Sequence, residues 1–347
     1  MGTAAPRTRP FPRTVAFFRR HPILLLLAFT PGIPEYLSGS SSVRLVALFP
    51  TGTVVFLLFL ALNLGLYGPG VLLVREAHVR WKKGWSTILL LGAAHGLLEE
   101  GTALSTLFDP HASVVGGLGS YGHAYGVSWV WLLGILGVHT VFSIGLPILL
   151  LGLALPETRG RPFLTGRSIP LVVLLFALDI AALNAVVGYR SGLGLQLGAA
   201  LVAAVLWLVA WRIPPGLLDP PAPAPRRGPR LFFVYGLAYF ALLILVPGIL
   251  GALHLPAPVA FAADAGALTL LFLAVWGAIG RGGHAPQMVL LALGLVLPLM
   301  VTGLVAQITL PLVLLLDVVA GLFFLTLWRH YRPTPAPTGA LLGAAVP

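Results

Sequence analysis

Long runs of apolar residues alternate with short polar turns along almost the whole chain. A helix needs about 20 apolar residues to cross a hydrocarbon core about 30 Å thick. Lipid forces each crossing to be helical, because a backbone without water must satisfy its own hydrogen bonds. The pattern predicts an all-α, polytopic integral membrane protein with about ten transmembrane helices, at residues 22–37, 51–74, 85–107, 127–155, 169–189, 193–212, 231–253, 257–279, 287–305 and 308–328.

The basic residues divide unequally between the two sides that these spans create. Of the 21 lysines and arginines, only Arg44 and Arg190 fall on one side, and the others share the side of the two termini. Cytoplasmic loops are enriched in Lys and Arg because membrane insertion retains positive charge inside. The division predicts a multi-pass protein of the cell (cytoplasmic) membrane, with both termini in the cytoplasm.

The polar segments also divide the chain into regions. The first span is short and contains Pro31 and Pro34, so whether it crosses the membrane completely stays open. The expected regions are a basic cytoplasmic segment at 1–21, a membrane domain of six spans with the candidate site at 22–212, a Pro-rich cytoplasmic linker at 213–230, a membrane domain of four spans at 231–332 and a disordered tail at 333–347.

Composition supports the membrane assignment and excludes other classes. The chain is 58% hydrophobic and 9% charged, against about 25% charged residues in soluble domains. The net charge of +11 does not indicate nucleic-acid binding, because the basic residues lie in short loops beside the spans, where topology explains them. The expected partner is the lipid bilayer. Without cysteine, disulfides and thiol chemistry are excluded.

Two adjacent glutamates, Glu99 and Glu100, interrupt the third apolar run. An acid at the membrane centre costs roughly 2.5–3.5 kcal/mol even on the lenient insertion scale, and intramembrane ionisable residues are functional by default. On a regular α-helix, residues three, four and seven apart share a face. That spacing predicts one stripe formed by Gly92, His95, Glu99, Thr102 and Thr106.

The fourth run adds His139 at a comparable depth and Ser143 one turn further along the same face. Glu35, Asp179, Asp264 and Asp317 also fall in the outer half of their spans. We expect a cavity that opens outward and holds a proton, a metal ion or a cationic group. The alternative is that a Glu99–histidine bond only links helices. The candidate substrate- or cation-binding residues are Glu99, Glu100, His95, His139, Thr102 and Ser143.

The same cluster supplies the ligand types of a divalent metal such as Zn, namely His95, Glu99, Glu100 and His139. The Glu99-Glu100 pair followed by His139 resembles the core of the CPBP (Abi) intramembrane proteases, over at most residues 85–190. That family carries EExxxR and later histidine-bearing helices. Here Leu104 stands in place of the arginine, and no third helix with His-x-x-x-Asn is present. The resemblance implies Glu99 as the group that activates water, and His139 as metal ligand or oxyanion donor.

Three function classes remain. A proton- or cation-coupled transporter or permease is slightly favoured, because it needs only a protonatable or cation-binding site and two accessible states. A metal-dependent intramembrane hydrolase is the first alternative, with Glu99, Glu100 and His139 as its catalytic residues. A non-catalytic membrane scaffold is the second. Ser143 as a nucleophile is disfavoured, because a serine one turn from His139 has poor attack geometry without an oxyanion hole.

Overall fold

The structure is a computed structural model that describes residues 12–39, 51–189, 191–217, 227–280, 284–307 and 311–332. Arg44, Arg190, the tail 333–347 and parts of the N-terminal segment and linker lie outside these residues. The first part of the chain contains α1 (Pro12–Arg20), α2 (Pro22–Pro31), η1 (Gly32–Leu37), α4 (Thr51–Trp81), α5 (Trp85–Leu97), η3 (Leu98–Ala103), α6 (Gly117–Ser120), β1 (His123–Ala124), β2 (Val127–Ser128), α7 (Trp129–Val138), η4 (His139–Gly145), α8 (Leu146–Ala154) and η5 (Pro156–Thr158).

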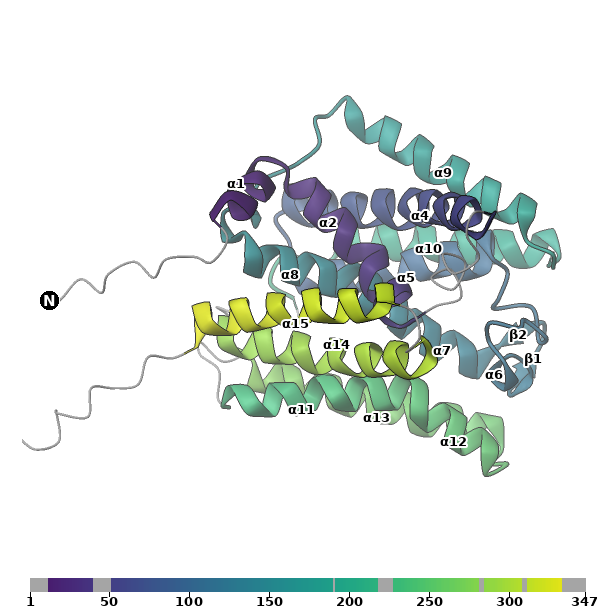
Figure 1. Cartoon of the computed structure of the whole chain (residues 1–347). Coiled ribbons are helices and arrows are strands. Elements are labelled where there is room, and N and C mark those ends of the chain that lie inside the picture. Colours follow the sequence, from purple (N-terminus) through teal and green to yellow (C-terminus); the bar gives the residue numbers. More distant parts are fainter. Residues whose placement is uncertain are drawn as a thin grey trace, which may run out of the picture.

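The elements of the later part are all helices, and they run roughly side by side with the earlier ones (Figure 1). Its elements are α9 (Ser168–Val186), α10 (Leu193–Arg212), α11 (Pro229–Phe240), η6 (Ala241–Leu245), α12 (Val246–Ala252), α13 (Ala257–Ala278), α14 (Ala285–Gln307) and α15 (Pro311–Tyr331).

Eight of the described helical segments are long and apolar enough to cross a membrane. The predicted first span is a shorter apolar helix, Pro22–Leu37. The predicted third span, formed by α5 and η3, is not among the eight, because His95 and the two glutamates lower its hydropathy. A helical, multi-pass architecture is therefore confirmed, and the count of ten stays a prediction.

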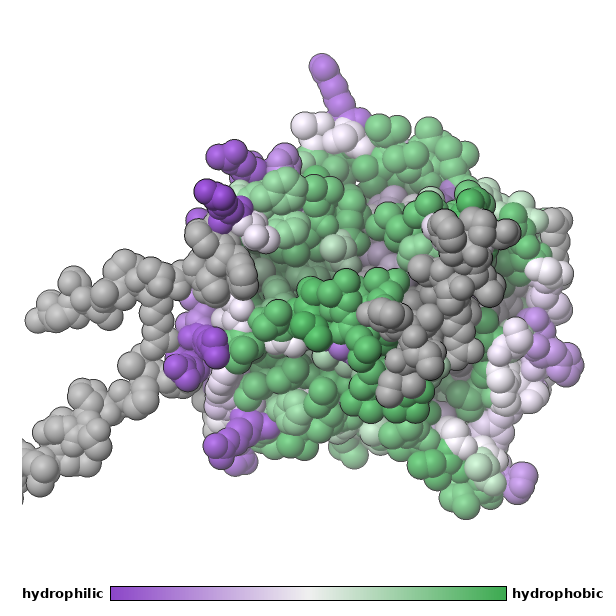
Figure 2. Space-filling model, viewed as in Figure 1, coloured by the Kyte–Doolittle hydropathy of each residue, from purple (hydrophilic) through white to green (hydrophobic). Residues whose placement is uncertain are grey.

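The helices have two chemically different ends. At one end the Nζ of Lys83 donates to the Ala210 carbonyl at 2.7 Å, and the Tyr331 hydroxyl donates to the Leu153 carbonyl at 2.8 Å. Hydrophilic side chains gather at this end, where α1 also lies, and a hydrophobic surface covers the rods between the ends (Figure 2). These contacts bring together segments that the span assignment places on one side of the membrane.

The opposite end carries the segment between η3 and α7, which includes α6 and the antiparallel pair β1–β2. The Tyr121 hydroxyl donates to the Leu255 carbonyl at 2.8 Å, and the Tyr189 hydroxyl donates to the Phe108 carbonyl at 3.2 Å. This segment therefore ties α9 and the α12–α13 turn to the end of the bundle beside η3.

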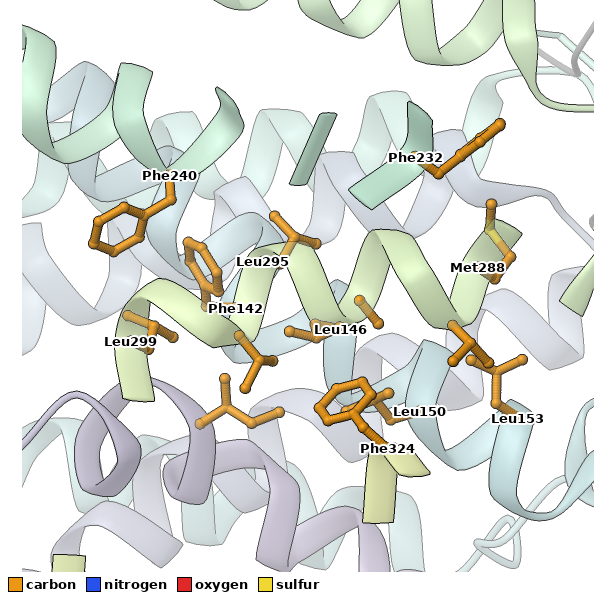
Figure 3. Close-up of a cluster of buried hydrophobic side chains, with 14 of the residues drawn as sticks. Phe142, Leu146, Leu150, Leu153, Phe232, Phe240, Met288, Leu295, Leu299 and Phe324 are labelled. Carbon is orange, nitrogen blue, oxygen red and sulfur yellow. The ribbon is translucent and has the colours of Figure 1, made fainter. Parts of the chain in front are cut away.

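The largest cluster of buried apolar side chains joins the earlier and later helices. Phe142 and Leu146 of η4 and α8 meet Phe240 of α11, Leu295 of α14 and Phe324 of α15 (Figure 3). Lipid tails are as apolar as these side chains, so close packing rather than the hydrophobic effect stabilises the contact. Phe142 lies only three residues from His139, and this core therefore supports the segment that carries the candidate histidine.

Helices α11 and α14 approach closely because glycines face each other. A Cβ atom added to Gly236 would lie 2.5 Å from the Leu291 carbonyl oxygen, and one added to Gly294 would overlap the Phe233 carbonyl. Small residues allow this backbone approach in membrane proteins.

Helix α4 continues to Trp81, seven residues beyond the predicted end of the second span. Arg75 and Glu76 lie just beyond the predicted end of that span, yet both side chains are buried rather than exposed to solvent. Arg75 donates through Nη2 to the Thr158 carbonyl at 2.5 Å and to the Arg161 carbonyl at 2.9 Å. These partners satisfy the guanidinium inside the protein.

Candidate functional site

Three neighbouring helices change locally from α to π geometry where their ionisable residues lie. Glu35 lies in η1, Glu99 and Glu100 lie in η3, and His139 is the first residue of η4. In η3 the wider turn continues as a hydrogen bond from Leu104 N to the Glu99 carbonyl at 2.8 Å. Single π turns within α-helices are rare and frequently lie at functional sites. A fourth π segment, η6, carries no ionisable residue.

His139 lies between the two glutamates. Its Nε2 is 2.9 Å from Glu100 Oε1, and its Nδ1 is 3.1 Å from Glu99 Oε2. The exposed fractions are 2% for His139, 2% for Glu99 and 6% for Glu100. Two helices that follow each other in sequence therefore place an imidazole and two carboxyl groups in direct contact inside the bundle.

His95 completes the centre of the cluster. Its Nε2 lies 3.3 Å from Glu99 Oε2, and its ring stacks on Phe176 of α9 with centroids 5.6 Å apart. A Cβ atom on Gly70 of α4 would lie 2.5 Å from His95 Nδ1, so the ring needs a glycine beside it.

The contacts of Glu99 Oε2 with the two imidazoles have ion-pair distances but lack hydrogen-bond geometry. The oxygen and both nitrogens of His95 are buried without a hydrogen-bond partner. These atoms are in contact, but they do not point at one another along a donor–acceptor line. Such an arrangement is expected when several donor atoms face a common point rather than each other.

Glu100 is held from its other side as well. The Thr106 hydroxyl donates to Glu100 Oε2, and Trp131 Nε1 of α7 lies 3.4 Å from the Thr106 oxygen. With His139 on Oε1, both carboxyl oxygens of Glu100 have partners. Glu100 therefore orients His139, whereas Glu99 faces both histidines.

Tyr67 and Glu35 extend the cluster toward α4 and η1. The Tyr67 hydroxyl donates to Glu35 Oε1 at 2.9 Å, and its ring stacks on His139 with centroids 6.2 Å apart. From the sequence, Glu35 was expected in the outer half of its span, whereas Tyr67 was not singled out. A signal was available, since Asn63 and Tyr67 are polar residues one helical turn apart in an apolar run.

Of the predicted stripe, the structure brings His95 and Glu99 together and directs the Thr102 hydroxyl to another helix. The Thr102 hydroxyl points to the Gln196 carbonyl of α10, at 3.5 Å, because the π turn of η3 rotates the residues that follow Glu99. Ser143 is buried, and its oxygen lies 3.2 Å from His139 Nδ1. Its contact is therefore with His139 rather than with either glutamate.

Three further acids, Asp179, Asp264 and Asp317, make no hydrogen bond or ion pair with the cluster among the described residues. Asp179 packs against Gly65 of α4. Asp264 of α13 is buried, and among the described residues neither of its oxygens has a hydrogen-bond partner. Asp317 of α15 is likewise outside the cluster's hydrogen bonds and ion pairs in the part of the chain that the structure covers.

The cluster is enclosed within the described part of the chain. Two cavities of about 380 Å³ and 370 Å³ are lined by residues other than its members. The side chains of the cluster are buried, and the outward opening stays a prediction.

His95, Glu99 and His139 each offer one ligand atom, and these atoms lie within 4.8 Å of one another. Around a tetrahedral zinc with bonds of about 2.0–2.1 Å, neighbouring ligand atoms are about 3.3 Å apart. The separations of 3.1 Å and 3.3 Å from Glu99 Oε2 match that edge length. The bond from His139 Nε2 to Glu100 is the arrangement by which a carboxylate orients a metal-binding imidazole. The residues present therefore fit a divalent metal ion.

Comparison with known proteins places the chain at the level of a family. No curated protein and no solved structure matches it. Residues 24–341, which include every member of the cluster, match the model of an uncharacterized membrane protein family. The chain therefore belongs to this family of membrane proteins.

Proposed function

We propose that this protein is a cation-coupled permease of the cell membrane, in which the cluster of His95, Glu99, Glu100 and His139 binds the cation. The observation that carries the proposal is the position of His139 between two buried carboxyl groups, at 2.9 Å and 3.1 Å. The proposed topology has ten spans with both termini in the cytoplasm. The candidate site lies in the membrane domain 22–212, and the domain 231–332 packs against it.

The charges of the cluster support cation binding. Two ionised carboxylates in a low-dielectric interior require compensation, since an unpaired buried charge costs several kcal/mol. Two imidazolium groups or one divalent ion can supply the two positive charges. A cluster that gives up its cation must therefore take up protons or rearrange, and either response couples cation occupancy to conformation.

The enclosure of the cluster favours transport over catalysis on a large substrate. A carrier alternates between states open to either side around a site near the bilayer midplane, and broken helices commonly line such sites. The π segments η1, η3 and η4, together with Pro69 of α4, supply irregular backbone around this cluster. The arrangement corresponds to the closed state through which a carrier passes.

Transport is tested with the full chain in proteoliposomes that contain a pH-sensitive dye and receive Zn²⁺, Mn²⁺ or another cation outside. We expect cation-dependent proton flux in the native protein and its loss in Glu99→Gln and in His139→Gln. Glu157→Gln is the matched control, because Glu157 lies in η5 and pairs with Arg19 at 2.9 Å. Flux that survives both cluster substitutions contradicts the proposal.

A metal-dependent hydrolase is the second candidate, favoured by the three possible ligands His95, Glu99 and His139. Catalytic zinc sites use three protein ligands and leave a fourth position for water. In this reading the metal would acidify that water, and the chain's residues would hold the metal and orient His139 through Glu100. Metal that copurifies at one equivalent, with peptide or lipid hydrolysis and without flux, favours this candidate. If the purified protein shows no bound metal, no flux and no hydrolysis, the remaining reading is a non-catalytic membrane scaffold.

A further inference from the structure

A cavity lies at the basic end of the bundle, beside α1 and away from the Glu/His cluster. Its volume is about 380 Å³. It forms where α1 ends, α2 begins and the chain following η5 passes beside them. Its lining residues are Arg20, His21, Pro22, Ile23, Leu24, Arg161, Pro162 and Phe163.

The charged residues of this cavity are basic. Arg20, His21 and Arg161 are exposed at it. The acid nearest in sequence, Glu157, pairs with Arg19 at 2.9 Å. Among the salt bridges of the described residues, none involves Arg20 or Arg161. The cavity therefore presents two guanidinium groups that are available to an anion.

The wall formed by Phe163 is held in place by a buried ion pair. Phe163 N donates to Glu76 Oε1 at 2.6 Å, and the guanidinium of Arg75 lies 3.3 Å from the centre of the Phe163 ring. Arg75 also donates to the Arg161 carbonyl at 2.9 Å. These contacts hold the backbone of this wall, between Arg161 and Phe163, against the bundle.

The floor of the cavity is apolar and continues onto the lipid-facing surface. Ile23 and Leu24 begin the hydrophobic helix α2, and the Leu24 side chain is 48% exposed. On the other side, α1 is strongly amphipathic, with Phe17 49% exposed and arginines in its last turn. Helices of this kind lie in the plane of the membrane interface. The cavity therefore lies at the boundary between headgroups and hydrocarbon.

From these observations we infer that this cavity binds the phosphate group of an anionic phospholipid, with Arg20 and Arg161 on the phosphate and an acyl chain along Leu24. Basic pockets between transmembrane helices on the cytoplasmic side are suited to such headgroups. Guanidinium groups bind phosphate oxygens in paired hydrogen bonds, which ammonium groups do not. The inference does not depend on the proposed transport function.

The test uses the full chain in detergent and native mass spectrometry with phosphatidylglycerol, and phosphatidylcholine as the neutral comparison. We expect retained phosphatidylglycerol on the native protein and a loss of affinity of roughly 20- to 30-fold in the double variant Arg20→Gln/Arg161→Gln, since each basic residue near a lipid surface contributes about fivefold. Arg212→Gln, at the same end but outside the cavity, is the matched control and should bind normally.

Further measurements distinguish a lipid phosphate from free inorganic phosphate as the ligand. Inorganic phosphate at millimolar concentration should not displace the lipid, and displacement would mean that the ligand is a soluble phosphate. Arg20→Lys/Arg161→Lys, which keeps the charge and the fold, should recover part of the affinity. Equal binding of phosphatidylcholine, or an equal loss in Arg212→Gln, overturns the inference.

Discussion

The helices that bear the Glu/His cluster and the helices α11 to α15 are held against their neighbours by different kinds of contact. Around His139, polar groups from η1, α4, η3 and η4 contact one another. Between α11 and α14, glycines bring two backbones together, and the described ion pairs lie elsewhere. Polar contacts in membranes add only about 1 kcal/mol each, so close packing of small residues is sufficient for stability. The two regions therefore show that this chain joins its helices both through polar side chains and through close backbone contact at glycines.

The largest difference between the two regions is expected when His139 is removed. His139→Ala leaves Glu99 and Glu100 buried without the imidazole between them, and loss of one partner from a buried charged pair costs about 3–5 kcal/mol. We expect that decrease in the free energy of unfolding, measured by titration with SDS. His284→Ala, an exposed position before α14, is the control and should change it little. Equal stability of the two variants would show that His139 is uncoupled from the glutamates.

The glycine contact is tested by Gly294→Ala. The added methyl group overlaps the Phe233 carbonyl, and overpacking of this kind costs about 1–3 kcal/mol. The expected result is a lower unfolding free energy with the cation response of the remaining folded protein intact. Gly266→Ala on α13 has open space around the new methyl group and should be neutral. A neutral Gly294→Ala would mean that α11 and α14 can separate without loss.

The smallest expected effect comes from removing one tyrosine hydroxyl in each region. Tyr67→Phe removes a hydrogen bond to Glu35, and Tyr239→Phe removes one to the Gly137 carbonyl of α7. Each should lower the free energy of unfolding by about 0.6 kcal/mol, the average for such bonds in a membrane protein. Only Tyr67→Phe should alter the affinity for the cation, measured by calorimetry. Identical cation affinities in the two variants would remove Tyr67 from the site.

Much of the helical pattern was accessible from sequence, because hydropathy and lipid physics act on each segment separately. The predicted fifth and sixth spans, 169–189 and 193–212, differ from α9 and α10 by at most three residues at either end. The predicted helix ends are wrong where contacts with residues distant in sequence determine where a helix ends. Helix α4 runs on because partners in a later loop satisfy Arg75. Helix η3 ends at Ala103, before a Ser105 backbone with a φ of 56°.

The candidate site was accessible only in part for the same reason. Glu99, Glu100 and His139 stand out because ionisable residues are rare in apolar runs. Tyr67 stands out less, since aromatic residues are common in membrane helices and its pairing with Asn63 one turn away is a weak signal. Its contact with Glu35 and the imidazole shows its place. Thr102 was misplaced because the π turn is a departure from the regular spacing on which the stripe was drawn.

The π segment η4 also changes the relation between α7 and α8. A π turn holds one residue more than an α turn, and one residue corresponds to a rotation of about 100°. Deleting a single residue between Thr140 and Ile144 would restore a regular helix and swing α7 around its own axis relative to α8. The extra residue therefore lets α8 pack against α14 while α7, on the other side of the π turn, packs against α13 with a different face.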